Sequence, residues 1–179
     1  RESGLSGEIH DKGMYILRGF VQATYAHDFA LSVKASIAFE QRYVEVDGDS
    51  ASAGEAMALL SASGEIPMRQ DVAMTGSVNQ LGQVQPVGGI SEKIEGFYAV
   101  CKISGLTGEQ GVIIPRSNIQ NLILSRDVQN AVDAGQFHIY VVESIDEGLH
   151  ILTGMKAEQV MRRIGKRLRE MAQQVKEFN

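Results

Sequence analysis

The run Gly-Val-Ile-Ile-Pro at residues 111–115 is apolar at every position. Such a run is typical of a strand in a parallel sheet, where helices cover both faces and neither set of alternating side chains meets water. Strand and helix signals alternate around it: strands over 70–76 and 81–87 joined by a short turn near Asn79, a helix over about 90–104 closed by Gly105, helical residues over 117–133 in two pieces, a strand over 137–142 and a helix over 144–153. Strands that alternate with helices predict an α/β or α+β fold.

The first third of the chain is predicted to supply two more strands and a helix. Residues 14–22 and 31–40 are the predicted strands, and the second alternates apolar side chains with a period of two. A turn over 47–54 leads into a helix of small residues over about 52–63, which Gly64 ends.

The composition of the 179 residues is that of one globular domain, with or without an appendage. Hydrophobic residues make up 44% and charged residues 22%, which excludes a disordered or low-complexity chain. Cys101 is the single cysteine, so no intrachain disulfide is possible, and we expect a reducing, cytoplasmic location. No uncharged apolar run reaches the ~18 residues that span a bilayer, and no signal peptide pattern is present, so no membrane partner is expected. The chain begins with Arg1 rather than methionine, so we expect it to be part of a longer protein.

The charge is divided between an acidic body and a basic C-terminal segment. The formal net charge is −5, which argues against nucleic acid as the main partner. Residues 155–179 nevertheless carry seven basic and three acidic side chains. Their apolar residues are spaced three and four apart, which predicts an amphipathic helix with the stripe Met161, Ile164, Leu168, Met171, Val175 and Phe178. We expect this helix to pack on its own domain, with an assembly element as the alternative.

Common catalytic and ligand-binding motifs are absent from the sequence. It has no G-x-x-x-x-G-K-[ST] loop to bind nucleotide phosphates, and no H-E-x-x-H motif or cysteine pair to bind zinc. Two helix starts remain: the turn 47–54 with Ser50 and Ser52, and residues 86–93, which put Lys93 in a first helical turn. A capping serine and a solvated lysine are the plain structural interpretations. A serine–lysine catalytic pair is the functional interpretation.

The residues of these two helix starts, together with a third motif between them, resemble the proteolytic domain of the Lon proteases. The motifs are Asp47-Gly48-Asp49-Ser50, Thr75-Gly76 and Gly88-Gly89-x-x-Glu92-Lys93. The resemblance runs from about His10 to Gly154, and it is greatest toward the archaeal-type enzymes and the Lon-related proteins of proteobacteria. It implies an α/β domain over residues 1–154 with a topology like that of ribosomal protein S5 domain 2. The basic helix 155–179 extends beyond it.

The resemblance also implies an activity, that of an ATP-dependent serine endopeptidase that cuts unfolded or damaged polypeptides. Ser50 would be the nucleophile and Lys93 its general base, while Thr75 would hydrogen-bond the lysine. No cofactor is implied in these residues, because ATP and Mg²⁺ would bind only in a separate ATPase region. A homohexameric ring is the implied assembly. The alternative is a Lon-like scaffold domain without proteolytic activity, since fold alone does not establish function.

The chemistry of a serine–lysine pair sets requirements on its surroundings. A free lysine, with a pKa of ~10.4, is almost fully protonated at pH 7 and cannot take the serine proton. Burial and a nearby helix N-terminus both disfavour an ammonium and so lower the pKa of a lysine. Both effects are possible at Lys93. Asp47 and Asp49 would oppose this, so we expect a resting ion pair between Lys93 and one of them. Ser52 is the rival nucleophile, and the N–H groups around Asp49–Ala51 are the expected oxyanion hole.

Overall fold

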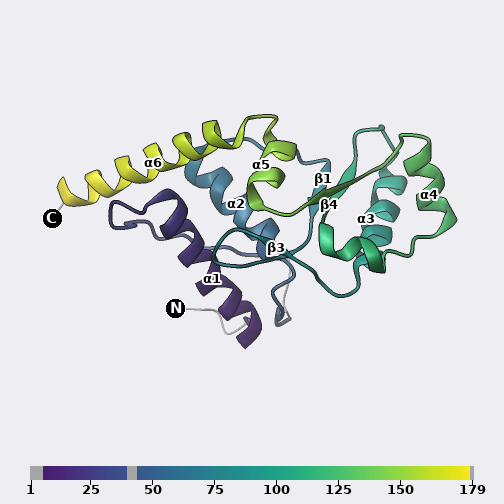
Figure 1. Cartoon of the computed structure of the whole chain (residues 1–179), viewed down its shortest axis with the longest axis horizontal. Helices are drawn as coiled ribbons and strands as arrows, with labels where there is room; N and C mark the ends of the chain where they lie inside the picture. The colour runs from purple at the N-terminus through teal and green to yellow at the C-terminus, as the bar shows by residue number, and fades with distance from the viewer. Residues whose placement is uncertain (1–5, 40–43, 178–179) are drawn as a thin grey trace.

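A three-stranded parallel sheet with β4 in its centre organises the fold. The structure is a computed structural model, and it describes residues 6–39 and 44–177. The strand order is β1-β4-β5, with bounds β1 (Val72–Met74), β4 (Gly111–Pro115) and β5 (His138–Val142). Val72 pairs with Gly111, and Gly111 pairs with His138, so the three strands begin at the same level of the sheet. Figure 1 shows the sheet in the middle of the molecule, with helices on either side.

Helices cover both faces of this sheet, as the apolar run 111–115 predicted. One side holds α1 (Glu8–Tyr25), α2 (Ser52–Gly64), α5 (Ile145–Thr153) and α6 (Ala157–Glu177), and the other holds α3 (Ile90–Ser104), the short 3-10 helix η1 (Arg116–Asn121) and α4 (Arg126–Asp133). Ile113 belongs to the core under the first set, while Val112 and Ile114 belong to the core under the second. All five residues of β4 are buried. The predicted α/β fold is therefore confirmed.

The N-terminal segment is a helix, so the strand predicted over 14–22 is wrong. α1 buries Leu17, Phe20, Val21 and Tyr25, whose spacing puts them on one helical face. A short run rich in Val, Ile and Phe fits an extended strand equally well, because local pattern alone does not separate the two. Packing against α2 and α6 selects the helix, since only that conformation brings all four side chains into one core.

Residues 31–39 form no strand, in contrast to the prediction for 31–40, and Glu40 lies outside the described residues. Leu31 and Val33 are half-buried against the main core, so the expected apolar face exists. A strand also needs a neighbour with which it exchanges backbone hydrogen bonds. None of the described strands pairs with this segment, so its alternating pattern occurs in irregular backbone.

A two-stranded antiparallel hairpin, β2 (Ser77–Val78) and β3 (Val84–Gln85), follows β1. The predicted turn near Asn79 is confirmed, since its side-chain oxygen accepts the N–H groups of Leu81 and Gln83 at 3.0 Å each. The two strands predicted on either side of this turn are shorter than expected. The first of them is split, because β1 pairs with β4 and only the two residues of β2 pair across the turn.

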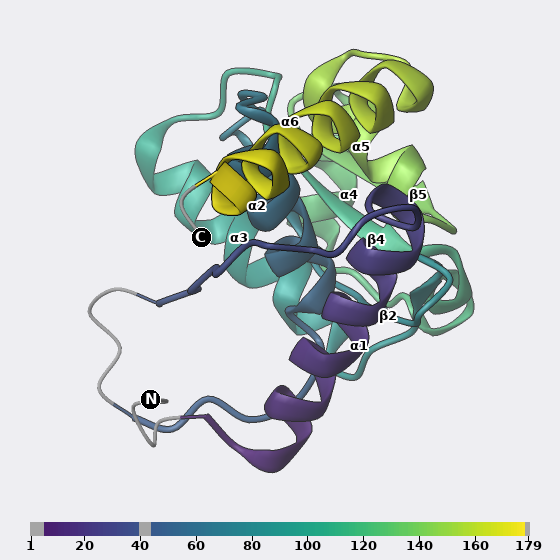
Figure 2. The ribbon, with the colours of Figure 1, turned by 90° about the vertical axis from the view of Figure 1, so that its left-hand side faces the viewer.

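α6 packs along its own chain, as expected for the C-terminal helix. Its buried face is rotated slightly from the predicted stripe and consists of Val160, Ile164, Leu168 and Ala172. Of the other predicted residues, Met161 and Met171 are half-buried, Val175 is exposed and Phe178 lies outside the described residues. Figure 2 shows α6 lying across α2, with which it shares the main core.

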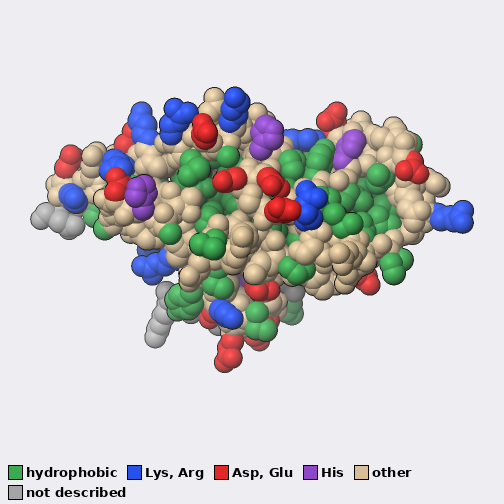
Figure 3. Space-filling view, in the orientation of Figure 1, with side chains coloured by type: hydrophobic (Ala, Val, Ile, Leu, Met, Phe, Trp, Pro, Cys, Tyr) green, Lys and Arg blue, Asp and Glu red, His purple; other side chains and the backbone are tan. Residues whose placement is uncertain are grey.

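The basic side chains of α6 line one edge of the molecule in Figure 3, and several of them hold neighbouring elements. Arg163 donates to the carbonyl groups of Gly64 and Glu65 at the end of α2, at 2.9 and 2.8 Å. A guanidinium suits this position, because the last carbonyls of a helix lack partners and carry the negative end of its dipole. Arg169 pairs with Asp28 and lies 4.8 Å from the centre of the Phe29 ring. The basic face therefore contributes to packing within the chain.

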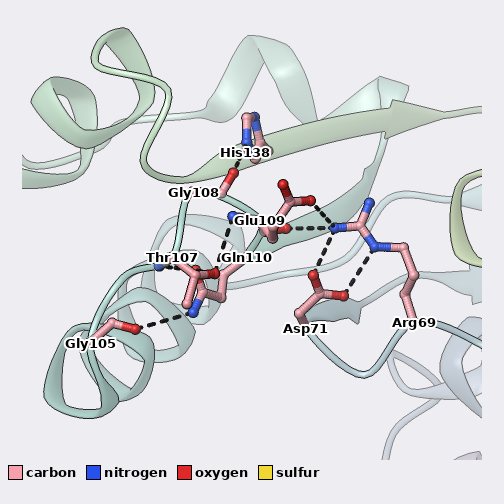
Figure 4. Close-up of polar contacts among 8 residues, drawn as sticks. All are labelled: Arg69, Asp71, Gly105, Thr107, Gly108, Glu109, Gln110 and His138. Atoms are coloured by element: carbon pink, nitrogen blue, oxygen red, sulfur yellow. Dashed lines mark hydrogen bonds and ion pairs between the residues drawn. The ribbon is translucent and has the colours of Figure 1, made fainter.

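Polar contacts close the amino-terminal edge of the sheet (Figure 4). Arg69 donates to both oxygens of Asp71, at 3.0 and 2.8 Å, and to the carbonyl of Glu109 at 2.7 Å. The guanidinium lowers the pKa of Asp71, because it binds the charged carboxylate. His138 Nε2 lies 2.7 Å from the carbonyl oxygen of Gly108. These contacts join the starts of the three parallel strands and leave the carboxyl-terminal edge to other segments.

The variant Ile164→Ala tests the packing of α6. Ile164 is fully buried, so removing most of its side chain leaves a cavity and should lower the free energy of unfolding by about 2–5 kcal/mol. Denaturant unfolding followed by circular dichroism measures the change. Gln173→Ala, at an exposed position of the same helix, is the control and should change stability by less than about 0.5 kcal/mol. Equal small effects would mean that α6 is not packed in solution.

Candidate active site

Ser50 lies in a turn, residues 47–51, that leads directly into α2. The helix begins at Ser52, its N-cap residue is Ala51, and no side chain caps it. Ser50 therefore does not have the capping role that is the usual structural reason for a serine at such a position. It is half-buried, which leaves part of it accessible from outside.

Two groups that follow β1 hold the main chain of Ser50. Its carbonyl oxygen accepts the backbone N–H of Gly76 at 3.0 Å and the hydroxyl of Thr75 at 3.1 Å. The N–H of Ala53 donates to the Gly76 carbonyl, also at 3.0 Å. Because the Thr75 N–H in turn bonds the Ile113 carbonyl of β4 at 3.1 Å, one residue ties the turn to the central strand.

Neutral donors engage the two aspartates of the turn. Asp49 accepts the hydroxyl of the buried Ser77 at 2.8 Å. Asp47 accepts two backbone N–H groups at the start of α1, at 3.0 and 3.2 Å. Backbone N–H groups, that of Gly48 first among them, lower the pKa of Asp47, because they bind its charged form.

The resting ion pair that we expected between Lys93 and one of these aspartates is not formed. Within residues 6–39 and 44–177, Lys93 takes part in no ion pair. Each carboxylate instead accepts from neutral donors, Asp47 from backbone N–H groups at the start of α1 and Asp49 from the Ser77 hydroxyl.

Lys93 is the fourth residue of α3 and follows a loop that a buried asparagine holds. Asn118 of η1 is 4% exposed, accepts the N–H of Val87 at 3.0 Å and donates to the carbonyl of Val87 at 2.9 Å. Gly89 then adopts a left-handed φ of 64°, which favours glycine, and is the N-cap residue of α3. Lys93 itself is exposed, so the described residues do not supply the burial that was expected to disfavour its ammonium.

The Ser50 turn and the Lys93 loop are anchored at the same edge of the sheet. Thr75 and Gly76 follow the carboxyl end of β1, and Asn118 follows the carboxyl end of β4. Because β1 and β4 are neighbouring parallel strands, these ends lie side by side. The carboxyl edge of such a sheet is where open α/β proteins bind their ligands. The fold therefore brings all three sequence motifs to one edge.

Ser52, the rival nucleophile, is covered by α1. It is 2% exposed, and Gly13 packs so closely that a Cβ atom there would lie 3.0 Å from the Ser52 hydroxyl oxygen. A polypeptide substrate cannot reach such a hydroxyl unless α1 moves. Of the two serines, Ser50 is therefore the more accessible.

A family model of the Lon protease (S16) C-terminal proteolytic domain matches residues 14–154. The chain belongs to this family. It is 43% identical over 179 residues to a Lon protease homolog of Escherichia coli K12, covering 97% of this chain and 30% of that protein. It is 47% identical over 154 residues to a Lon protease homolog of Haemophilus influenzae, covering 86% and 26%. The archaeal Lon protease of Thermococcus kodakarensis is 36% identical over 164 residues, covering 90% and 24%.

This Lon-type domain therefore spans about a quarter to a third of the length of these relatives. Among its motif residues, Thr75 was expected to hydrogen-bond Lys93, and its hydroxyl instead donates to the carbonyl of Ser50. The hydroxyl oxygen keeps acceptor lone pairs that a lysine N–H could use. The contact between Thr75 and Lys93 stays a prediction.

Two contacts of the Lon-type domain were not predicted from its sequence. One is the bond pair between Asn118 and Val87, and the other joins His10 Nε2 to Glu55 Oε1 at 2.7 Å. Glu55 is 4% exposed in the first turn of α2. Its position among small apolar residues of the sequence could have predicted that this carboxylate is buried and has a hydrogen-bond partner. Nothing in the sequence pointed to His10, which lies 45 positions earlier.

Neither a metal site nor a membrane span is found in the described part of the chain. No group of three or more His, Cys, Asp or Glu side chains there is arranged to hold a metal ion. None of the helices in that part is both long and apolar enough to cross a bilayer.

The variant Asn118→Ala tests the anchor of the Lys93 loop. It removes both bonds to Val87 and leaves partly buried backbone groups unpaired, so the free energy of unfolding should fall by about 1–3 kcal/mol. Denaturant unfolding measures the loss. Asn121→Ala, at an exposed position of the same short helix, is the matched control and should be nearly neutral. A neutral Asn118→Ala would show that the loop does not depend on this clamp.

Proposed function

We propose that this Lon-type domain is a serine endopeptidase domain in which Ser50 is the nucleophile and Lys93 is the general base. The observation that carries the proposal is a half-buried serine whose main chain is held at the same sheet edge as the loop of Lys93. Membership of a proteolytic-domain family supports hydrolysis of peptide bonds. The burial of Ser52 argues against the alternative nucleophile.

In the proposed reaction, Ser50 Oγ attacks the carbonyl carbon of a substrate peptide bond while the Lys93 amine accepts the hydroxyl proton. The carbonyl π electrons move onto the oxygen and form a tetrahedral oxyanion. When this intermediate collapses, the C–N bond breaks and the leaving amine takes the proton back from Lys93. Water then attacks the carbonyl carbon of the ester on Ser50 and loses a proton to Lys93. The bond from that carbon to Ser50 Oγ breaks, the acid product leaves, and Ser50 Oγ takes the proton back from Lys93. None of the described carboxylates pairs with Lys93, so no ion pair has to break before the amine can act.

The N–H groups of Ser50 and Ala51 are the proposed donors to the oxyanion. They precede α2, where the helix dipole favours negative charge. No acceptor within the described residues takes up either N–H group. Both are therefore free to bind an oxyanion that forms on Ser50.

Asp47, Asp49 and Thr75 support the site through its geometry in this proposal. The two carboxylates hold the turn against α1 and Ser77, and Thr75 holds the Ser50 carbonyl. Because Lys93 is exposed, we propose that the substrate or a neighbouring copy of the chain covers its amine. Either one would remove water from the amine, and burial of a lysine favours the neutral form that a general base needs.

The full-length protein is proposed to cut unfolded or damaged polypeptides in the cytoplasm as an ATP-dependent homohexameric ring. The relatives support a protease that is longer than this chain, since they are named Lon proteases or Lon protease homologs and are about three to four times its length. ATP dependence, the ring and the cytoplasmic location are what the resemblance to Lon proteases implies. ATP and Mg²⁺ would act in a nucleotide-binding region of that longer protein, because these residues contain no phosphate-binding loop motif.

Hydrolysis of unfolded casein by the full chain tests the assignment. Ser50→Ala should abolish cleavage and cost little stability, because the Ser50 side chain caps nothing. Lys93→Arg should be as inactive as Lys93→Ala, because an arginine keeps the charge and cannot release a proton. Ser52→Ala is the matched control at the neighbouring serine and should still cleave.

Three results would contradict parts of this proposal. Cleavage by Ser50→Ala with none by Ser52→Ala would reverse the nucleophile assignment. Substantial cleavage by Lys93→Arg would restrict Lys93 to an electrostatic role. No cleavage by the unmodified chain or by any variant would favour the non-proteolytic scaffold.

A further inference from the structure

His10, in the first turn of α1, contacts both ends of the segment that contains Ser50. Its backbone N–H donates to Asp47 Oδ1 at 3.2 Å, before Ser50. Its ring Nε2 lies 2.7 Å from Oε1 of Glu55. Glu55 follows Ser50 in the sequence and lies in the first turn of α2. One residue of α1 therefore spans the whole turn.

The bond between His10 and Glu55 is sheltered from water. The side chains are 13% and 4% exposed, so solvent competes weakly for their polar atoms. A buried carboxylate without a partner is costly, which makes this contact an obligatory one for Glu55. The pair therefore constrains where α1 and α2 lie relative to each other.

The second ring nitrogen of His10 extends the network to the surface. Nδ1 lies 2.8 Å from the hydroxyl oxygen of Ser6, and Ser6 donates its proton to Asp11. The contacts of its two ring nitrogens, one with Ser6 and one with Glu55, hold the ring of His10 in one plane.

The N-cap residue and the second turn of α1 pack against the Ser50 turn. A Cβ atom on Gly7 would lie 2.4 Å from the Asp47 side chain. A Cβ atom on Gly13 would lie 3.5 Å from that of Asp49. The opposite side of the turn is held by Thr75 and Gly76, which the sheet fixes. The side of the Ser50 turn that faces α1 is held by the polar contacts from α1.

We propose that His10 is a positioning residue for the nucleophile. By holding Asp47 and Glu55 at a set separation, it fixes the orientation of the turn between them and hence of the Ser50 hydroxyl. None of the described hydrogen bonds of His10 is to Ser50, so His10 acts through the turn. The effect on catalysis rests on the proposed role of Ser50, whereas the effect on the turn does not.

Steady-state cleavage of a quenched fluorescent casein peptide by the full chain tests the catalytic effect. His10→Ala should lower kcat by about 10–100-fold with KM within about twofold, because a nucleophile displaced by about 1 Å loses rate rather than binding. His10→Gln keeps the backbone bond and offers an amide N–H to Glu55, so it should recover kcat to within about fivefold of the unmodified chain. Glu55→Ala should match His10→Ala, and the double variant should add little, because both remove the same contact.

His138→Ala is the matched control. It removes a half-buried histidine whose Nε2 also makes a 2.7 Å contact, to the Gly108 carbonyl, at the opposite edge of the sheet (Figure 4). It should lower the melting temperature and leave kcat within about twofold. A loss of kcat in His138→Ala equal to that in His10→Ala would mean that stability alone explains the effect. That result would overturn the proposal.

Amide hydrogen exchange gives a second measurement that does not depend on catalysis. The N–H groups of Ser52 and Glu55 donate within the turn and the first turn of α2, to Asp49 and Ala51. Their exchange should accelerate about tenfold or more in His10→Ala and stay unchanged in His138→Ala. Unchanged exchange in His10→Ala, or equal kcat for the alanine and glutamine variants, would overturn the proposal. If the unmodified chain cleaves nothing, or if Ser50→Ala cleaves normally, the proposed function fails instead and exchange alone decides the role of His10.

Discussion

The burial of β4 on both of its faces is the constraint on which the rest of the structure depends. A strand with apolar side chains on each side needs a cover of helices above and below it. Ile113 faces the core of α1, α2, α5 and α6, while Val112 and Ile114 face the core of α3 and α4. The sheet is parallel and helices connect its strands, which collects the carboxyl ends of the strands at one edge. That edge is where the candidate active site lies.

At this edge, hydrogen bonds set the orientation of the functional segments. The Ser50 turn is bonded to Thr75 and Gly76 on one side and to the start of α1 on the other. The Lys93 loop is bonded through Val87 to Asn118. Hydrogen bonds are directional and short, so they specify the orientation of a turn in a way that non-directional hydrophobic contact does not. A site whose groups must meet a reacting bond at defined angles benefits from that kind of anchor.

The charges of the site are arranged so that Lys93 lacks a carboxylate partner among the described residues. Two aspartates lie within three positions of Ser50, and either could have stabilised the ammonium. Both are instead turned toward neutral donors, Asp47 toward α1 and Asp49 toward Ser77. The negative charge therefore stabilises the turn and leaves the lysine available. This division of roles suits a base that has to lose and regain a proton.

The sequence by itself determined the α/β class, the central strand, the helices over 90–104 and 144–153, and the three motifs of the site. These features can be predicted from local patterns, such as an apolar run, a helical spacing or a glycine at a turn. Such patterns depend only on residues that are close together in the sequence. Only the tertiary structure decided that residues 14–22 belong to a helix and that 31–39 pair with no described strand, since both outcomes depend on which surfaces meet. The partners of Asp47, Asp49, Glu55 and Val87 were likewise decided there. Each partner lies 28 to 45 positions away along the chain, so no short-range pattern can predict it. The physical reason is that buried polar groups bond to whichever partner the fold brings close to them.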